Sequence, residues 1–132
     1  SLNYLKSKGI SCELIDLRSI NPIDWETITK SVKKTKRLLV LDTGAETNSV
    51  ASEIIAKVSI DLFSFLSESP ARICLPDAPV PASFSLTQDF YPTSKNITEK
   101  VCSMLNVSFN INDFQQSSFH HDVPGDWFKG PF

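Results

Sequence analysis

Three short apolar runs, separated by segments with a helical pattern, most constrain how this chain can fold. The runs cover residues 12–17, 37–43 and 71–75. Apolar runs of this length suit strands that are buried on both faces, as in a parallel sheet. Alternating strands and helices with short connections place helices on both sides of such a sheet. The sequence therefore predicts an α/β fold of three layers, α/β/α, around a mostly parallel sheet of three strands.

Four segments around these runs have the features of helices. Residues 2–8 are typical of a helix end, with lysines in the last turn and Gly9 as a left-handed cap. Asp24 can cap a second helix, whose last turn carries lysines that complement the helix dipole. The strongest helical period runs over residues 50–66, and a further helix is expected to begin at Ser94. These helices alternate with the apolar runs, as the α/β prediction requires.

Two other segments lack a regular period. Four of the eight prolines lie in residues 76–92, where we expect neither helix nor sheet. After Asn106 the chain mixes polar residues with scattered aromatic ones, and a disordered linker would normally be poor in aromatics. We therefore predict a domain at residues 1–106 and an aromatic-rich tail at residues 107–132 that packs on the domain or on another subunit. The expected anchors in this tail are Trp127, Phe128 and Phe132.

Composition limits the class of partner. The net charge is −2, and the lysines and glutamates are interspersed, so we expect neither nucleic acid nor a membrane surface as partner. No stretch approaches the roughly 18 apolar residues of a membrane span, and the first residues lack the pattern of a signal peptide. Cys12, Cys74 and Cys102 are widely spaced and form no CxxC pair, which is typical of reduced core thiols. We predict a soluble, cytoplasmic chain.

Asp16 and Arg18 are the first candidates for a functional site. They follow the first apolar run, and open α/β sheets bind ligands beyond the carboxyl ends of their strands. The alternative is that they pair locally or with a neighbouring subunit and fix the loop before Pro22. We favour the alternative and an interface role, because an isolated charge pair is weak evidence for chemistry.

The loop before the long central helix is the second candidate. Free N–H groups at a helix N-terminus can hold an anion. Asn48 or Ser49 can satisfy the same groups as a cap, and we favour that interpretation. His120, His121 and Asp122 could donate metal ligands, but adjacent histidines on an extended segment point in opposite directions. We therefore expect no metal site, no catalytic residue and no cofactor-binding residue in this chain.

A family resemblance rests on several motifs that occur in a fixed order. They are GISCELIDLRSINPIDWETITKSVKKTKRLLVLDTG, then SEI, then PARICLPDAPVP, then FYPTSKNITEKV. Together they resemble the C-terminal domain of transketolase-like enzymes over about residues 1–106. The resemblance is greatest to the beta subunit of the thiamine-diphosphate-dependent decarboxylating component of 2-oxo-acid dehydrogenase complexes.

The resemblance implies a role in assembly. In this family thiamine diphosphate and magnesium are held between other domains, so the fragment alone is expected to be inactive. The whole enzyme would decarboxylate a 2-oxo acid and pass the acyl group to lipoate. Implied partners are an alpha subunit or partner domain, a second beta subunit and the subunit-binding domain of a lipoyl acyltransferase. Alternatives are the C-terminal domain of a transketolase or sugar-phosphate synthase, and a stand-alone binding or assembly module.

The chain also departs from the family pattern. The family domain normally begins with a strand and the first half of a helix, and neither is found before residue 1 of this sequence. We therefore expect that the first strand of the sheet is missing from the fragment. Such a gap would leave a sheet edge with unpaired backbone groups unless a partner or the tail covers it.

Overall fold

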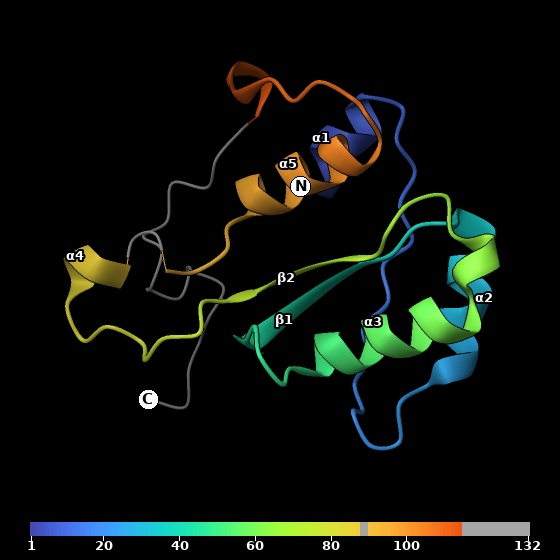
Figure 1. The fold of residues 1–132 in the computed structure, drawn as a ribbon. Helices are drawn as coiled ribbons and strands as arrows, with labels where there is room; N and C mark the ends of the chain where they lie inside the picture. The colour runs from blue at the N-terminus through green and yellow to red at the C-terminus, as the bar shows by residue number, and fades with distance from the viewer. Residues whose placement is uncertain (88–89, 115–132) are drawn as a thin grey trace.

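The computed structural model describes residues 1–87 and 90–114. The elements follow one another in the order α1 (Leu2–Ser7), α2 (Trp25–Thr35), β1 (Leu39–Ala45), α3 (Val50–Asp61), η1 (Phe63–Phe65), β2 (Ala71–Leu75), α4 (Phe84–Thr87), α5 (Ser94–Met104) and η2 (Ile111–Asp113). Figure 1 shows α3 on one side of the sheet, with α2 next to it, and α1 and α5 on the other side. The predicted α/β class with layers of helices around a parallel sheet is confirmed.

The sheet is smaller than predicted. Strands β1 and β2 pair in parallel, with Leu39 opposite Ala71 and Val40 opposite Arg72, and α3 forms the crossover between them. These two are the only strands in the part of the chain that the structure describes. None of their residues is fully buried, and the Leu41 side chain is 47% exposed. Within the described residues each strand has a pairing partner on one side only. The burial of the strands on both faces, which the sequence predicted, is therefore not reached.

Residues 12–17 form no strand, which corrects the first strand prediction. The segment is extended, and Glu13 accepts hydrogen bonds from Ser31 and Lys34 on α2. Ile15 and Leu17 pack toward the core, while the intervening residues are exposed. A short apolar run therefore does not by itself specify a strand, and this segment finds its contacts on a helix rather than on a sheet edge.

The core consists of two clusters on opposite sides of the sheet. The larger one joins α2 and α3, whose apolar residues recur at intervals of four and so share one face of each helix. Its buried members are Ile28, Val32, Ile54, Val58 and Leu62. The smaller one joins α1, α5 and the chain after α5, and its buried members are Tyr4, Leu5, Cys102 and Phe114. Each cluster connects helices that are far apart in the sequence.

The helix ends follow local signals, with two corrections. Asp24 caps α2 by accepting a hydrogen bond from the Thr27 N–H at 3.0 Å, as predicted, and Gly9 has the expected positive φ of 74°. Helix α3 ends at Asp61 instead of continuing to residue 66, and the turn η1 follows it. The proline-rich segment contains the short helix α4, which forms between prolines rather than across one. No helix in the described ranges is long and apolar enough to cross a bilayer.

Candidate functional site

The carboxyl ends of β1 and β2 carry a network of polar side chains, at the edge where open α/β sheets build their sites. Asp42, on β1, accepts hydrogen bonds from the Gly44 N–H at 2.8 Å and from the Ala51 N–H at 3.0 Å. Ser49 caps α3 and accepts from the Ser52 N–H at 3.2 Å. The predicted cap at this helix is therefore confirmed, with Ser49 as the capping residue. Two N–H groups of the first turn of α3 thus already donate to side chains of the chain itself.

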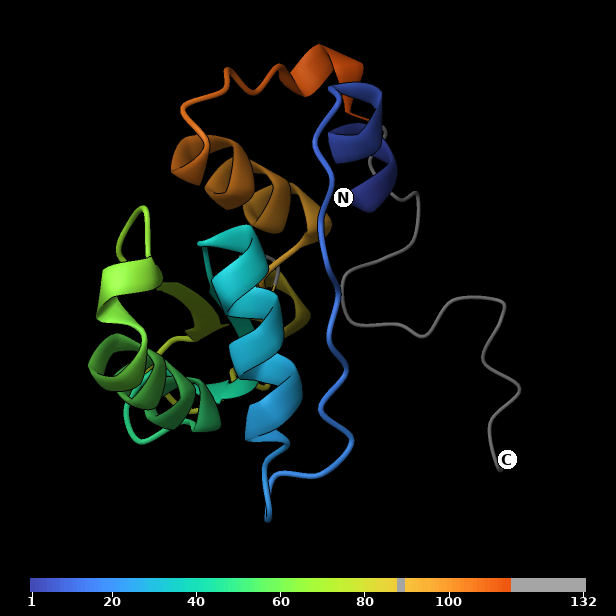
Figure 2. The same ribbon diagram turned by 90° about the vertical axis from the view of Figure 1, so that its right-hand side faces the viewer.

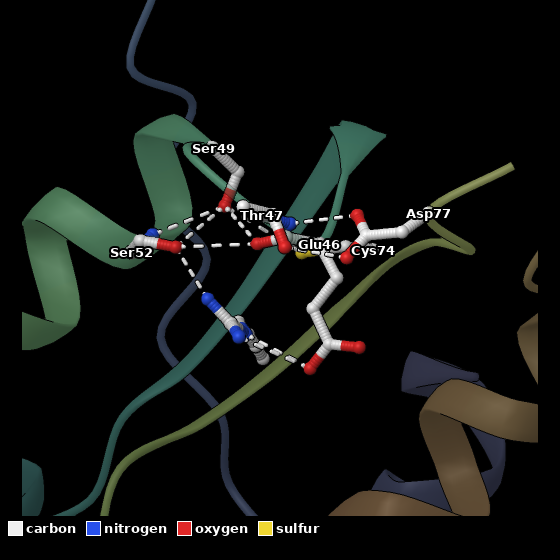
Figure 3. Close-up of polar contacts among 7 residues, drawn as sticks. Glu46, Thr47, Ser49, Ser52, Cys74 and Asp77 are labelled. Carbon is white, nitrogen blue, oxygen red and sulfur yellow. Dashed lines mark hydrogen bonds and ion pairs between the residues drawn. The ribbon is translucent and has the colours of Figure 1, made fainter.

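An ion pair connects the loop before this helix to the second strand. Arg72, on β2, donates to the Glu46 carboxylate from Nη2 at 3.1 Å and from Nε at 3.3 Å. Its Nη1 donates to the Ser52 hydroxyl, which in turn donates to the Glu46 carbonyl oxygen at 3.3 Å. Figure 3 shows Ser49, Ser52 and Glu46 together at the start of α3. The arrangement ties the loop, the strand and the helix to one another.

A second carboxylate joins the two loops that follow the strands. Asp77 accepts from the Thr47 N–H at 2.8 Å and from the Thr47 hydroxyl (Figure 3). These two hydrogen bonds, first that of the hydroxyl and then that of the backbone, hold the pKa of Asp77 below its usual value. The Ser49 hydroxyl lies 3.9 Å from the thiol of Cys74. The Asp77 carboxylate therefore accepts hydrogen bonds that hold the two loops together.

The polar groups near the strand ends mostly bind one another. Within residues 1–87 and 90–114, no three Asp, Glu, His or Cys side chains are grouped so that they could hold a metal ion. Free N–H groups at a helix N-terminus can hold a phosphate, but α3 already donates to Asp42 and Ser49, and α2 already carries an anion, Asp24, at its N-terminus. The arrangement at the strand ends is suited to holding the fold together rather than to binding the coenzyme.

Asp16 and Arg18 pair with each other away from this network. The Arg18 Nε lies 3.5 Å from the Asp16 carboxylate, and the two side chains are 86% and 78% exposed respectively. No strand precedes them, so they do not stand at the end of a sheet strand as the sequence suggested. Their interface role stays a prediction. The predicted interface residues Trp127, Phe128 and Phe132 lie outside the described residues, as do His120, His121 and Asp122, for which no metal site was expected.

The three cysteines are free thiols in different environments. Cys102 is buried between α5 and α1, Cys74 is half-buried and Cys12 is exposed. The prediction of core thiols is therefore confirmed for Cys102 and wrong for Cys12, because residues 12–17 lie on the surface instead of in the sheet. Burial raises the pKa of the Cys102 thiol, which keeps it in the less reactive protonated form.

The chain after α5 returns to α1, in a set of contacts that the sequence did not specify (Figure 2). The Asn110 N–H donates to the Tyr4 hydroxyl at 3.1 Å, and Lys8 pairs with Asp113 at 2.9 Å. Three rings meet beside these bonds with centroid distances of 5.4–5.7 Å, those of Tyr4, Phe109 and Phe114. Residues 107–114 therefore pack on the domain itself, one of the two outcomes expected for the tail.

Comparisons with known proteins identify the family. The model of the "Transketolase, C-terminal domain" family matches residues 2–97. The pyruvate dehydrogenase E1 component subunit beta of Mycoplasma pneumoniae is 53% identical over 77 residues, which are 58% of this chain and 23% of that protein. The mitochondrial pyruvate dehydrogenase E1 component subunit beta of Chaetomium thermophilum is 40% identical over 105 residues, 80% of this chain and 28% of that protein.

A third relative is named for a different activity. The acetoin:2,6-dichlorophenolindophenol oxidoreductase subunit beta of Cupriavidus necator is 34% identical over 93 residues, 70% of this chain and 28% of that protein. The chain thus spans about a quarter of the length of the relatives it matches. The resemblance inferred from the sequence motifs is confirmed, and the chain belongs to the family of the transketolase C-terminal domain.

Proposed function

We propose that this chain is the C-terminal domain of the beta subunit of a thiamine-diphosphate-dependent 2-oxo-acid dehydrogenase. The observation that carries the proposal is the family match over residues 2–97, together with 40–53% identity to two pyruvate dehydrogenase E1 beta subunits. The whole enzyme would then decarboxylate a 2-oxo acid oxidatively and transfer the acyl group to lipoate. Pyruvate is the substrate to test first, because two of the three relatives described above are named for it.

Within that enzyme the chain contributes interfaces rather than catalysis. The carboxylates and helix N-termini at the strand ends already bind one another, which leaves the coenzyme and magnesium to other parts of the enzyme. The exposed pair Asp16 and Arg18 and the tail residues Trp127, Phe128 and Phe132 are the proposed contacts. Their partners would be the alpha subunit, a second beta subunit and the subunit-binding domain of a lipoyl acyltransferase.

The proposed location is the cytoplasm. Of the relatives described above, the beta subunits of Mycoplasma pneumoniae and Cupriavidus necator are not named as mitochondrial. The relative from Chaetomium thermophilum is named as mitochondrial, so the location of the family differs between organisms. Fractionation of the source cells with an antibody against this chain would decide between the two.

A domain exchange tests the proposed function. The matching segment of the Mycoplasma pneumoniae beta subunit is replaced by this chain, the chimera is combined with the other subunit of that enzyme, and turnover of pyruvate and of acetoin is measured. We expect assembly and pyruvate turnover within about tenfold of the parent, since no catalytic group has been exchanged; tenfold corresponds to about 1.4 kcal/mol. A matched chimera with Ile54→Asp, which breaks the larger core cluster, should not assemble. A folded chimera that fails to assemble, or that assembles without turnover, would contradict the proposal.

A further inference from the structure

Three apolar side chains form an exposed surface where α3 ends, which we call the α3 patch. Ile60, Phe63 and Phe65 are 80%, 79% and 43% exposed. Ile60 lies in the last turn of α3, and Phe63 and Phe65 lie in the turn η1 that follows it directly. A single exposed apolar residue is ordinary, but adjacent ones that include two phenyl rings mark a contact surface.

Lysine residues at the end of α2 lie close to this patch. The Lys33 ammonium lies 5.1 Å from the centroid of the Phe65 ring, and the Ser67 N–H donates to the Lys36 carbonyl oxygen at 2.9 Å. These two contacts bring the end of α2 against the turn that carries the patch. Lys30 lies one turn earlier on α2 and is also exposed. Lys33 therefore borders the apolar surface on its α2 side, and Lys30 and Lys36 lie three residues before and after it in the sequence.

These lysines form no salt bridge among the described residues, although Lys30 helps to lower the pKa of Glu13. Lys34, on the same helix, pairs with Glu13, and Asp61, next to the patch, pairs with Lys57 at 2.8 Å. Glu68 follows the turn and makes no ion pair in the described part of the chain. Positive charge is therefore in excess around the α3 patch, although the whole chain has a net charge of −2.

We propose that the α3 patch binds a segment of a partner protein in which acidic and apolar side chains lie together. Burial of Phe63 needs apolar groups on the partner, and a partner without carboxylates would leave Lys33 desolvated without compensation. A second copy that met the same patch across a two-fold axis would bring like charges together, which opposes self-association. The inference rests on the proposed assembly role and deepens it, because it names the surface and the chemistry of the partner.

Fluorescence anisotropy with labelled 15-residue peptides tests this proposal on the full 132-residue chain. The probe alternates glutamates with leucines and phenylalanines. One control peptide replaces the glutamates by lysines, and the other replaces the apolar residues by serines. We expect saturable binding of the probe that weakens with added salt, and at least tenfold weaker binding of both controls.

Paired variants of the chain locate the binding surface. Phe63→Ser and Lys33→Glu should each weaken binding of the probe about tenfold, because one removes the apolar anchor and the other reverses a bordering charge. The matched controls are Leu86→Ser, on α4, and Lys100→Glu, on α5. Each makes the same kind of change, apolar to serine or lysine to glutamate, at an exposed residue away from the α3 patch. These should change the affinity less than twofold. Thermal melting confirms that all four variants stay folded.

Several results would overturn the proposal. These are no binding of the probe, equal binding of either control peptide, or equal loss of affinity in the control variants. Binding to vesicles of phosphatidylserine and phosphatidylcholine in place of the probe would assign the surface to a membrane. An oligomer that Phe63→Ser dissociates, measured by light scattering, would assign it to a second copy. The peptide assay does not use turnover, so its failure would leave the result of the domain exchange unaffected.

Discussion

Replacing Phe114 by Ala tests whether the chain after α5 packs on α1. The Phe114 side chain is 8% exposed, and its ring lies 5.7 Å from the rings of Tyr4 and Phe109. Substituting a buried Phe by Ala costs about 3–5 kcal/mol, and the low end applies here because this cluster lies at the edge of the domain. A loss of about 3 kcal/mol in a domain of this size lowers the melting temperature by roughly 10 °C.

Urea unfolding followed by circular dichroism measures this change. The matched control is Phe63→Ala, the same substitution at a side chain that is 79% exposed, which should change the free energy of unfolding by less than about 0.5 kcal/mol. Truncation after Asn106 should destabilise the chain more than truncation after Phe114, because only the shorter chain uncovers Tyr4. If Phe114→Ala and Phe63→Ala had the same stability, residues 107–114 would not pack on α1 and the reasoning would be refuted.

Three further predictions concern the strand ends and the exposed pair. Asp42→Ala should lower the free energy of unfolding by about 1–2 kcal/mol in urea titrations, because two backbone N–H groups lose their acceptor; an unchanged midpoint would contradict this role. The pKa of Asp77 is held below its usual value by Thr47, so its stabilising contribution is present above the usual carboxyl pKa of about 3.9 and is lost as the pH falls through the lower pKa of the folded state. Asp77→Asn should therefore flatten the dependence of stability on pH in this acid range, measured by melting at a series of pH values, and an unaltered profile would show that the two hydrogen bonds do not form. Arg18→Ala should change the unfolding free energy of the isolated chain by less than about 0.5 kcal/mol, because its ion pair is exposed, and any effect should appear in subunit association measured by sedimentation.

Local signals predicted the helices well. Asp24 and the lysines at the end of α2 lie within one helix, so their spacing alone specifies where it begins and ends. The end of α3 was harder, because the apolar period continues through Phe65 and Leu66 while the helix stops and the turn η1 takes over. Residues 12–17 show the limit of pattern reasoning, since a short apolar run is consistent with a strand but does not specify which element it will contact.

The network at the strand ends could not be predicted from spacing. Thr47 and Asp77 are 30 positions apart, and Glu46 and Arg72 are 26 apart, so only the parallel pairing of β1 and β2 brings them together. One signal was available in the sequence. An aspartate lies near the end of the second and of the third apolar run, Asp42 within residues 37–43 and Asp77 two residues after Leu75, and parallel strands end at the same edge of a sheet.

Isothermal titration calorimetry of the 132-residue chain with thiamine diphosphate and magnesium tests the central claim most directly. The claim is that this domain contributes interfaces and that the coenzyme is bound by other parts of the enzyme. We predict no saturable heat at millimolar coenzyme, because the N–H groups and carboxylates at the strand ends are already paired. A dissociation constant in the micromolar range, equivalent to about −8 kcal/mol, would contradict the account and place a coenzyme site in this chain.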